Sequence, residues 1–470
     1  MLFSSMVFLW LFLPFTFVVY QILNDKYKNV FLLIMSLLFY AWGEPKNIVL
    51  MIAVVCINYI FGIFIDKYKK YKKIFLILCI ISNLMILGYF KYYDFIVSNI
   101  NRVAGSEVLS LRGIILPIGI SFYIFQTMSY VADLYRGDIK VQKNIINLAL
   151  YTSFFPQLIA GPIVKYHDIE KQINVRTITH EKLAYGIKRF IYGLSKKVIL
   201  SNIIAEAVDT ILAYNALELS ASAIWAAILL YTLQIYFDFS GYSDMAIGLA
   251  KMFGFDLNEN FNYPYLSKSI TEFWRRWHIS LSTWFKEYVY IPLGGNRKGK
   301  ARTYINLSIV FLLTGIWHGA SFNFIVWGII HGIFMVLERI GFLKIIQKNF
   351  VTKIFGHIYT LSIVIISWTF FRANSLSQAL QWLKIMFTGN DYEGRLYSLA
   401  NFIDTRLIIV AIAGVVFCGV LQAVIGKLKQ ILFDENKMYF VENIMQLILL
   451  IICIMLLVND TYNPFIYFKF

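Results

Sequence analysis

Long apolar segments with few charged residues recur along the chain and restrict what it can fold into. The first is Met1–Asn24, which contains no charged residue, and the last is Ile444–Val458. A helix needs about 20 mostly apolar residues to cross the core of a bilayer. Charged residues make up 15% of the sequence, against about 25% in an ordinary soluble chain. The pattern predicts an all-α polytopic membrane protein with about 11 crossings, completed by re-entrant or interfacial helices.

The formal net charge of +16 is concentrated in loops between the apolar segments, in the stretches Asp66–Lys73, Lys165–Lys197 and Lys268–Arg302. Basic loops of a membrane protein tend to face the cytoplasm. Met1–Asn24 lacks a basic flank and is long enough to span, so we expect a first crossing rather than a removable signal peptide. The pattern predicts a multi-pass protein of the cell membrane with both termini outside. The basic loops indicate orientation and contact with the lipid bilayer, not nucleic acid.

One apolar segment interrupts the pattern expected of a multi-pass protein, in which successive loops lie on alternating sides of the membrane. Ile145–Gly161 lies between two basic stretches that both read as cytoplasmic, and Pro156 and Pro162 flank its end. Proline breaks helices, and broken backbone at membrane depth is tolerated only where protein or a cavity covers it. We therefore expect a pair of re-entrant half-helices here.

Polar side chains occur inside the apolar segment 229–250. Gln234 and Asp238 are spaced so that they share a helix face, and Asp244 follows further along. Ionisable residues within a membrane segment are expensive and are often functional. We expect Gln234, Asp238 and Asp244 to form a structural polar network, although a transporter would also carry such residues.

Two histidines have the surroundings of candidate catalytic groups. The stretch Ile270–Gly299 has the periodicity of an amphipathic interfacial helix, with His278 between its apolar and polar faces. His318 follows Trp317 in an apolar segment and lies between Gly315 and Gly319. A neutral imidazole can serve as a general base. The histidine spacing does not resemble a metal site, and the cysteines show no CxxC pairing, so no metal is expected. His167 stands in a charged loop and shows no pattern of its own.

Several motifs are missing from the chain. It contains no GxSxG nucleophile elbow and no Walker-type phosphate loop. It also lacks a DxD motif, which weakens a glycosyltransferase interpretation. An ordinary hydrolase and an ATP-driven pump are therefore disfavoured.

An ordered set of motifs resembles the membrane-bound O-acyltransferase (MBOAT) family. These are PIGISFYIFQTMSYVADLYRG at 117–137, FFPQLIAGPIVKY at 154–166, YFDFSGYSDMAIG at 236–248, EFWRRWHISLSTWF at 272–285, WHG at 317–319 and FFRA at 370–373. YIPLGGNRKG at 290–299 is similar to the bacterial polysaccharide O-acetylation branch, which is AlgI-like. The resemblance implies a ring of transmembrane helices around a central funnel and tunnel. Residues 1–458 would form this membrane domain, and residues 459–470 an extracellular tail.

The same resemblance implies roles for individual residues. His318 matches the family's catalytic histidine, His278 the second functional histidine, and Tyr467 the centre of an FxYxxF tail that carries an acyl group. Aromatic residues at the end of the chain would otherwise read as interfacial anchors. Acetyl-CoA is the expected donor, no cofactor is expected to bind tightly, and Arg275 and Arg276 are candidates for the donor phosphates. An extracellular SGNH-type O-acetyltransferase would pass the acetyl group to a polysaccharide. D-alanyl transfer to teichoic acid is the alternative cargo.

Overall fold

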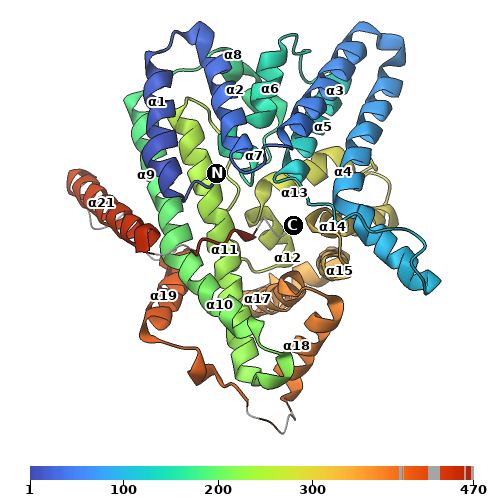
Figure 1. Cartoon of the computed structure of the whole chain (residues 1–470). Coiled ribbons are helices and arrows are strands. Elements are labelled where there is room, and N and C mark those ends of the chain that lie inside the picture. Colours follow the sequence, from blue (N-terminus) through green and yellow to red (C-terminus); the bar gives the residue numbers. More distant parts are fainter. Residues whose placement is uncertain (391–393, 395, 422–434, 460–461, 467–470) are drawn as a thin grey trace. The chain divides into compact units, whose positions relative to one another are not determined.

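The computed structural model describes residues 1–390, 394, 396–421, 435–459 and 462–466 (Figure 1). Within these residues the secondary structure is helical, and no β-strand is found. An isolated bridge joins Leu219 to Tyr397. The all-α prediction is therefore confirmed for this part of the chain.

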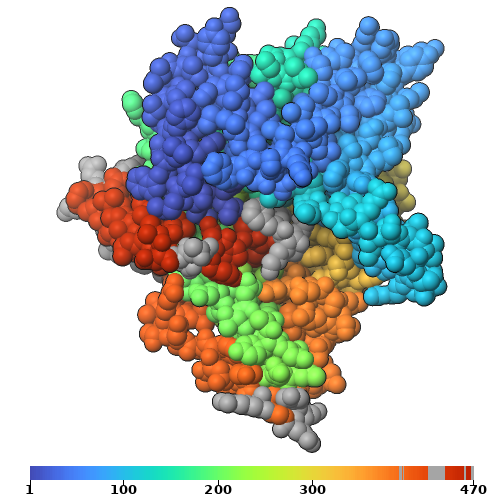
Figure 2. Space-filling model, viewed as in Figure 1, coloured from blue at the N-terminus to red at the C-terminus, as the bar shows by residue number. Residues whose placement is uncertain are grey.

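Five of the described helical segments are long and apolar enough to cross a bilayer. They are Ile48–Lys67, Lys69–Ala104, Ala221–Met252, Phe350–Arg372 and Phe440–Asn459. Large apolar side chains such as Met85 on helix α4 (Lys72–Ala104) and Leu447 on helix α21 (Glu435–Asn459) are exposed. Figure 2 shows the surface of the protein coloured by position in the sequence. Exposed apolar surface of this kind marks contact with a membrane or a partner. The predicted total of about 11 crossings stays a prediction.

The chain divides into two compact units, and the first contains residues 1–190 and 243–258. Its helices are η1 (Phe8–Phe12), α1 (Leu13–Ile22), α2 (Asp25–Ala41), α3 (Ile48–Lys67), η2 (Lys69–Tyr71), α4, α5 (Ile120–Arg136), α6 (Ile145–Ser153), α7 (Phe155–Leu158) and α8 (Tyr166–Asn174). Helices α3, α4 and α5 pack against one another, and α2 packs on α6.

The second unit contains residues 191–242 and 259–470. Its helices are η3 (Lys196–Asn202), α10 (Ile203–Ala213), η4 (Ala216–Glu218), η5 (Pro264–Leu266), α12 (Ile270–Arg276), α13 (Ile279–Phe285), η6 (Lys286–Tyr290), α14 (Lys300–His318), α15 (Phe322–Leu337), η7 (Glu338–Phe342), α16 (Leu343–Ile346), α17 (Phe350–Arg372), α18 (Leu376–Thr388), η8 (Leu399–Asn401), α19 (Thr405–Val415), η9 (Val416–Val420) and α21. Helices α9 (His180–Ser195) and α11 (Ala221–Met252) run through the division between the units.

The apolar segment 145–161 is broken as its prolines predict. Helix α6 ends at Ser153, Phe154 leaves the helical conformation with ψ 111°, and α7 begins with Pro156 in its first turn. The break is held from outside the segment, because the Phe155 N–H donates to the Ser36 hydroxyl at 3.1 Å. The break is confirmed, whereas its re-entrant path through a bilayer stays a prediction.

Candidate active site

His318 is the last residue of helix α14 and is enclosed by aromatic rings. Its side chain is 4% exposed. The ring centroids of Trp317, Trp327 and Phe371 lie 5.0, 4.9 and 5.0 Å from that of His318, and each of the three packs nearly edge-on. Such packing fixes the orientation of the imidazole and keeps bulk water away from it.

The position of the α14 C-terminus depends on close packing against α15. A side chain added at Gly315 would meet the Phe324 carbonyl, and one added at Gly328 would meet the Phe311 carbonyl. Glycine at both positions therefore lets the two backbones approach closely. Asn323, at the start of α15, donates to the backbone carbonyls of Phe370 and Ala373 at 3.1 and 2.7 Å. This contact ties the loop after His318 to the end of α17.

His278 breaks the stretch that the sequence predicted as one amphipathic helix. Helix α12 ends at Arg276 and α13 begins at Ile279, and His278 between them has φ 43°, in the left-handed region. A residue other than glycine in this conformation costs about 1–3 kcal/mol. The prediction of a continuous helix over Ile270–Gly299 was wrong because Asn260, which lies outside this stretch, replaces the helical hydrogen bonds at the break.

The side chain of Asn260 contacts three hydrogen-bonding groups at the break, one of His278 and two of Ser280. Its side-chain Oδ1 lies 3.1 Å from His278 Nδ1 and accepts from the Ser280 N–H at 3.2 Å and the Ser280 hydroxyl at 2.9 Å. The backbone N–H is always a donor, which identifies the shared Asn260 atom as the oxygen. His278 Nδ1 therefore carries the hydrogen, and Nε2 of the neutral ring is an acceptor. His278 is completely buried, and burial lowers its pKa to about 3.

Trp317 brings the two histidines into one aromatic cluster. Its ring centroid lies 6.1 Å from that of His278 and 5.0 Å from that of His318. Phe239 of α11 packs edge-on against His278 at 4.7 Å. Trp317 thus contacts both His278 and His318.

The two arginines have different surroundings. Arg276 forms an ion pair with Glu272, with Nε and Nη2 at 3.0 and 2.9 Å from Oε1, and it also donates to the Asn262 carbonyl at 3.1 Å. Arg275 is exposed. Arg276 therefore has a local structural role, and phosphate binding by either arginine stays a prediction.

The polar residues of α11 have separate partners. The Asp238 carboxylate lies 2.5 Å from Lys197 Nζ, and both side chains are almost completely buried. Asp244 forms an ion pair with Arg189 at 2.6 Å. Gln234 is buried one turn before Asp238. A shared network of Gln234, Asp238 and Asp244 stays a prediction, and the structure assigns the two carboxylates to different ion pairs.

The tail is described as far as Ile466, so Tyr467 and Phe470 lie outside the described residues. Phe465 is buried and stacks on Tyr242 with a centroid distance of 4.7 Å. The Ile466 N–H donates to Asp238 Oδ2 at 2.8 Å. The residues just before Tyr467 therefore pack against α11.

His331 is a core histidine with both ring nitrogens satisfied. The Trp274 indole N–H donates to His331 Nδ1 at 3.3 Å, and Nε2 lies 3.0 Å from the Ser367 hydroxyl. An indole nitrogen can only donate, so the hydrogen of His331 is on Nε2. This arrangement holds α12, α15 and α17 together.

Comparison with known proteins identifies the family. The family model described as MBOAT, membrane-bound O-acyltransferase family, matches residues 139–378, about half of the chain. The "Probable alginate O-acetylase AlgI" of Pseudomonas syringae pv. tomato is 42% identical over 89% of this chain and 82% of its own length. The chain belongs to the membrane-bound O-acyltransferase family.

Two further relatives of this O-acyltransferase carry different names. A protein of Helicobacter pylori named peptidoglycan O-acetyltransferase is 35% identical over 100% of this chain and 98% of its own length. A teichoic acid D-alanyltransferase of Bacillus subtilis is 31% identical over 46% of this chain and 58% of its own length. Membership of an acyltransferase family sets aside the transporter alternative.

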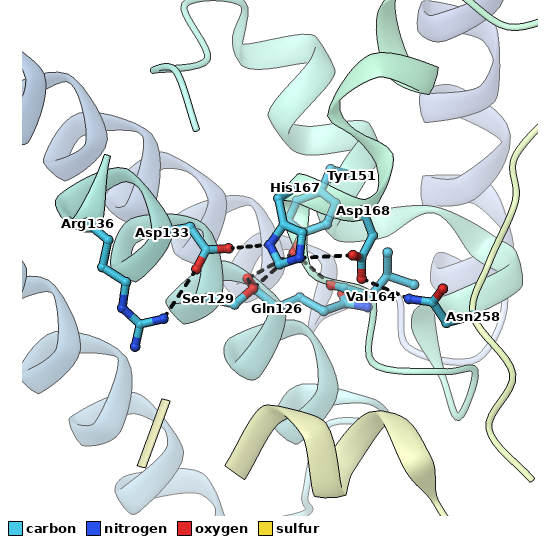
Figure 3. A network of polar contacts seen from close by, with 9 residues as sticks. All are labelled: Gln126, Ser129, Asp133, Arg136, Tyr151, Val164, His167, Asp168 and Asn258. Atoms are coloured by element: carbon cyan, nitrogen blue, oxygen red, sulfur yellow. Dashed lines mark hydrogen bonds and ion pairs between the residues drawn. The ribbon is translucent and has the colours of Figure 1, made fainter. Parts of the chain in front are cut away.

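The first unit of this acyltransferase contains a polar cluster that no sequence motif indicated (Figure 3). The two ring nitrogens of His167 lie 3.0 Å from carboxylate oxygens of Asp133 and Asp168. Asn258 donates to the other oxygen of Asp168 at 3.0 Å, and Arg136 lies 3.8 Å from Asp133. The cluster connects α5, α8 and the chain after α11. His167 is thus a structural residue that spacing along the sequence did not reveal.

Asn260 and Lys197 were also missed. Neither stands in a stretch that the motif analysis singled out for chemistry, yet Asn260 fixes the tautomer of His278 and Lys197 pairs with Asp238. The one usable signal for Lys197 was the buried acidic residue itself, because a carboxylate inside an apolar segment requires a partner.

Proposed function

We propose that this membrane O-acyltransferase moves an acetyl group from a cytoplasmic donor, acetyl-CoA, to the hydroxyl of Tyr467 for O-acetylation of a cell-surface polysaccharide. The observation that carries the proposal is that two buried histidines, His318 and His278, both pack against Trp317. The names of the relatives that align with most of the chain, alginate O-acetylase and peptidoglycan O-acetyltransferase, support acetyl as the cargo.

His318 is the general base in this proposal. A tyrosine phenol has a pKa near 10 and needs a base to become a nucleophile at neutral pH. His318 takes the phenolic proton as the Tyr467 oxygen attacks the thioester carbonyl. The carbon–sulfur bond then breaks, and the leaving thiolate takes the proton from the imidazolium. Because His318 ends helix α14, the negative end of the helix dipole stabilises that imidazolium by about 0.3–1 kcal/mol.

His278 is a positioning residue for the donor. With Nδ1 donating to Asn260, its Nε2 accepts a hydrogen bond, and an acyl-CoA offers amide N–H groups in its pantetheine arm. Polarising a thioester carbonyl requires a donor, so that role does not fit this tautomer. The donor phosphates would meet the exposed Arg275, and no tightly bound cofactor is needed for the reaction.

The acetyl group on Tyr467 then requires an acceptor outside the cell. We propose an extracellular SGNH-type O-acetyltransferase, which takes the acetyl group from the tyrosine ester and passes it to the polysaccharide. This step requires an outside C-terminus and a location in the cell membrane, which the basic loops support. D-alanyl transfer remains the second candidate cargo, supported by the relative that aligns with 46% of this chain.

The test measures acetyl esters on the surface polysaccharide of cells that carry Tyr467→Phe. This change removes one hydroxyl and keeps the aromatic ring, so we expect acetylation to be lost. Tyr27→Phe, at an exposed position of α2, is the matched control and should leave acetylation unchanged. Normal acetylation in the Tyr467→Phe cells would contradict the relay. Alanyl esters in place of acetyl esters in unmodified cells would contradict the cargo.

A further inference from the structure

We propose that Lys197, Asn202, Asp209, Asp238 and Tyr242 form a binding site for the chain's own C-terminal segment. We call these residues the tail clasp. Each residue from Tyr462 to Ile466 contacts one of them. The clasp is a set of positioning residues that present Tyr467, and this purpose rests on the proposed function.

The buried ion pair is the centre of the tail clasp. Lys197 Nζ and Asp238 Oδ1 are 2.5 Å apart, with side chains 2% and 1% exposed. The attraction within a buried pair rarely repays the loss of hydration unless further hydrogen bonds satisfy both ions. The tail supplies such bonds, because Lys197 donates to the Pro464 carbonyl and Asp238 accepts from the Ile466 N–H. The ion pair thus binds the backbone of the tail, with Lys197 as the donor and Asp238 as the acceptor.

Side-chain contacts extend the clasp to the two residues before Pro464. The Tyr462 hydroxyl donates to Asp209 Oδ2 at 2.5 Å, and Arg372 holds the other oxygen of Asp209 at 2.6 Å. Asn463 accepts from the Asn202 amide at 3.2 Å. These contacts require polar groups at two consecutive tail positions.

The aromatic residue after Pro464 has its own contacts. The Phe465 ring stacks on Tyr242, and Lys197 Nζ lies 5.8 Å from the Phe465 centroid, within cation–π range. Pro464 has no N–H, so the backbone at that position has no donor to satisfy. The clasp therefore suits a short segment of polar, proline, aromatic and aliphatic residues in that order.

The end of the clasp is close to the candidate active site. Ile466 is the residue directly before Tyr467, and its N–H is bound by Asp238. The next residue of α11, Phe239, packs on the ring of His278. The clasp thus fixes the chain one residue before the proposed acceptor, at the helix that also contacts the second histidine.

Hydrogen exchange of the C-terminal segment, followed by mass spectrometry on the full chain in lipid nanodiscs, tests the clasp. The double variant Lys197→Met with Asp238→Leu removes both charges together, so that neither ion is left buried alone. We expect the amide of Ile466 to exchange at least about tenfold faster in this variant, because an amide that loses its hydrogen bond opens more readily. Unchanged exchange in the folded double variant would overturn the proposal.

Asp244→Asn is the matched control. It changes a carboxylate of the same helix that pairs with Arg189, and it should leave exchange of the tail unchanged. If the double variant does not fold, Tyr242→Leu removes only the ring beneath Phe465 and should accelerate exchange severalfold. Equal acceleration by Asp244→Asn, or none by Tyr242→Leu, would count against the clasp.

The exchange measurement needs no acyl donor, so the clasp and the relay can fail separately. A released tail with normal acetylation in Tyr467→Phe cells would support the clasp and contradict the relay. A tail that is still protected from hydrogen exchange in the double variant would contradict the clasp. The Tyr467→Phe cells would still test the relay separately.

Discussion

His278 and His318 belong to one aromatic cluster, but the protein holds them in different ways. His278 is fixed by hydrogen bonds in a strained backbone conformation, and Asn260 determines which ring nitrogen carries the hydrogen. His318 is held by the edges of three aromatic rings at the end of a helix. The first arrangement suits a residue that recognises one hydrogen-bonding partner. The second suits a residue that gains and loses a proton, because the C-terminal end of α14 favours the positively charged form of the ring.

The largest effect is expected at His318. The variant His318→Gln keeps a polar side chain but removes the base, so acetyl transfer should fall by about 10²–10⁴-fold. Donor binding should change little. Steady-state transfer by the protein in nanodiscs measures kcat and KM separately, and a variant that changes KM alone would assign His318 to binding.

A smaller effect with a different signature is expected at His278. Replacing it with Gln removes one hydrogen-bond acceptor for the donor, worth about 0.5–1.5 kcal/mol, and this converts to about 2–13-fold in kcat/KM. The change should appear in KM. A loss in kcat as large as that of His318→Gln would show that both histidines take part in the chemical step and would remove the distinction between them.

Asn260 links the strain at His278 to stability. Asn260→Ala removes the oxygen that accepts from His278 Nδ1 and from both donors of Ser280, and should lower the free energy of unfolding by about 1–3 kcal/mol. Asn260→Asp keeps an oxygen acceptor and should be the milder change. Thermal unfolding of the two variants side by side provides the measurement, and equal melting temperatures would contradict the proposed role of the oxygen.

The smallest effect on catalysis is expected at a histidine outside the pair. His331→Gln should lower the melting temperature, because its two hydrogen bonds join α12, α15 and α17. The kcat of the folded protein should fall by no more than about fivefold, since one lost hydrogen bond is worth about 1 kcal/mol. A kcat loss comparable to that of His318→Gln would contradict a role for His318 that the other buried histidines do not share.

The sequence predicted the helical class and the break near Pro156 because both depend on local pattern. Apolar periodicity marks helices, and proline prevents them from continuing. The candidate pair was also visible, since histidine beside tryptophan and glycine inside an apolar segment is unusual. The motifs then connected His278 and His318 to one family.

What the sequence did not predict depends on contacts between distant residues. Periodicity continued through His278, yet Asn260 stabilises a left-handed residue there. The partner of Asp238 is Lys197, which stands in a basic stretch that otherwise indicated only membrane orientation. His167 looked ordinary until folding brought Asp133 to one side of its ring. In each case the deciding partner lies on another element, where local pattern carries no information.

The central claim is that Tyr467 receives the acetyl group with help from His318. The most direct test incubates the full chain in nanodiscs with acetyl-CoA and analyses its C-terminal peptide by mass spectrometry. We predict one acetyl group on Tyr467 in the unmodified protein and little or none in His318→Gln. An unmodified tyrosine in a protein that still transfers acetyl groups would contradict the account, as would equal acetylation of Tyr467 in both proteins.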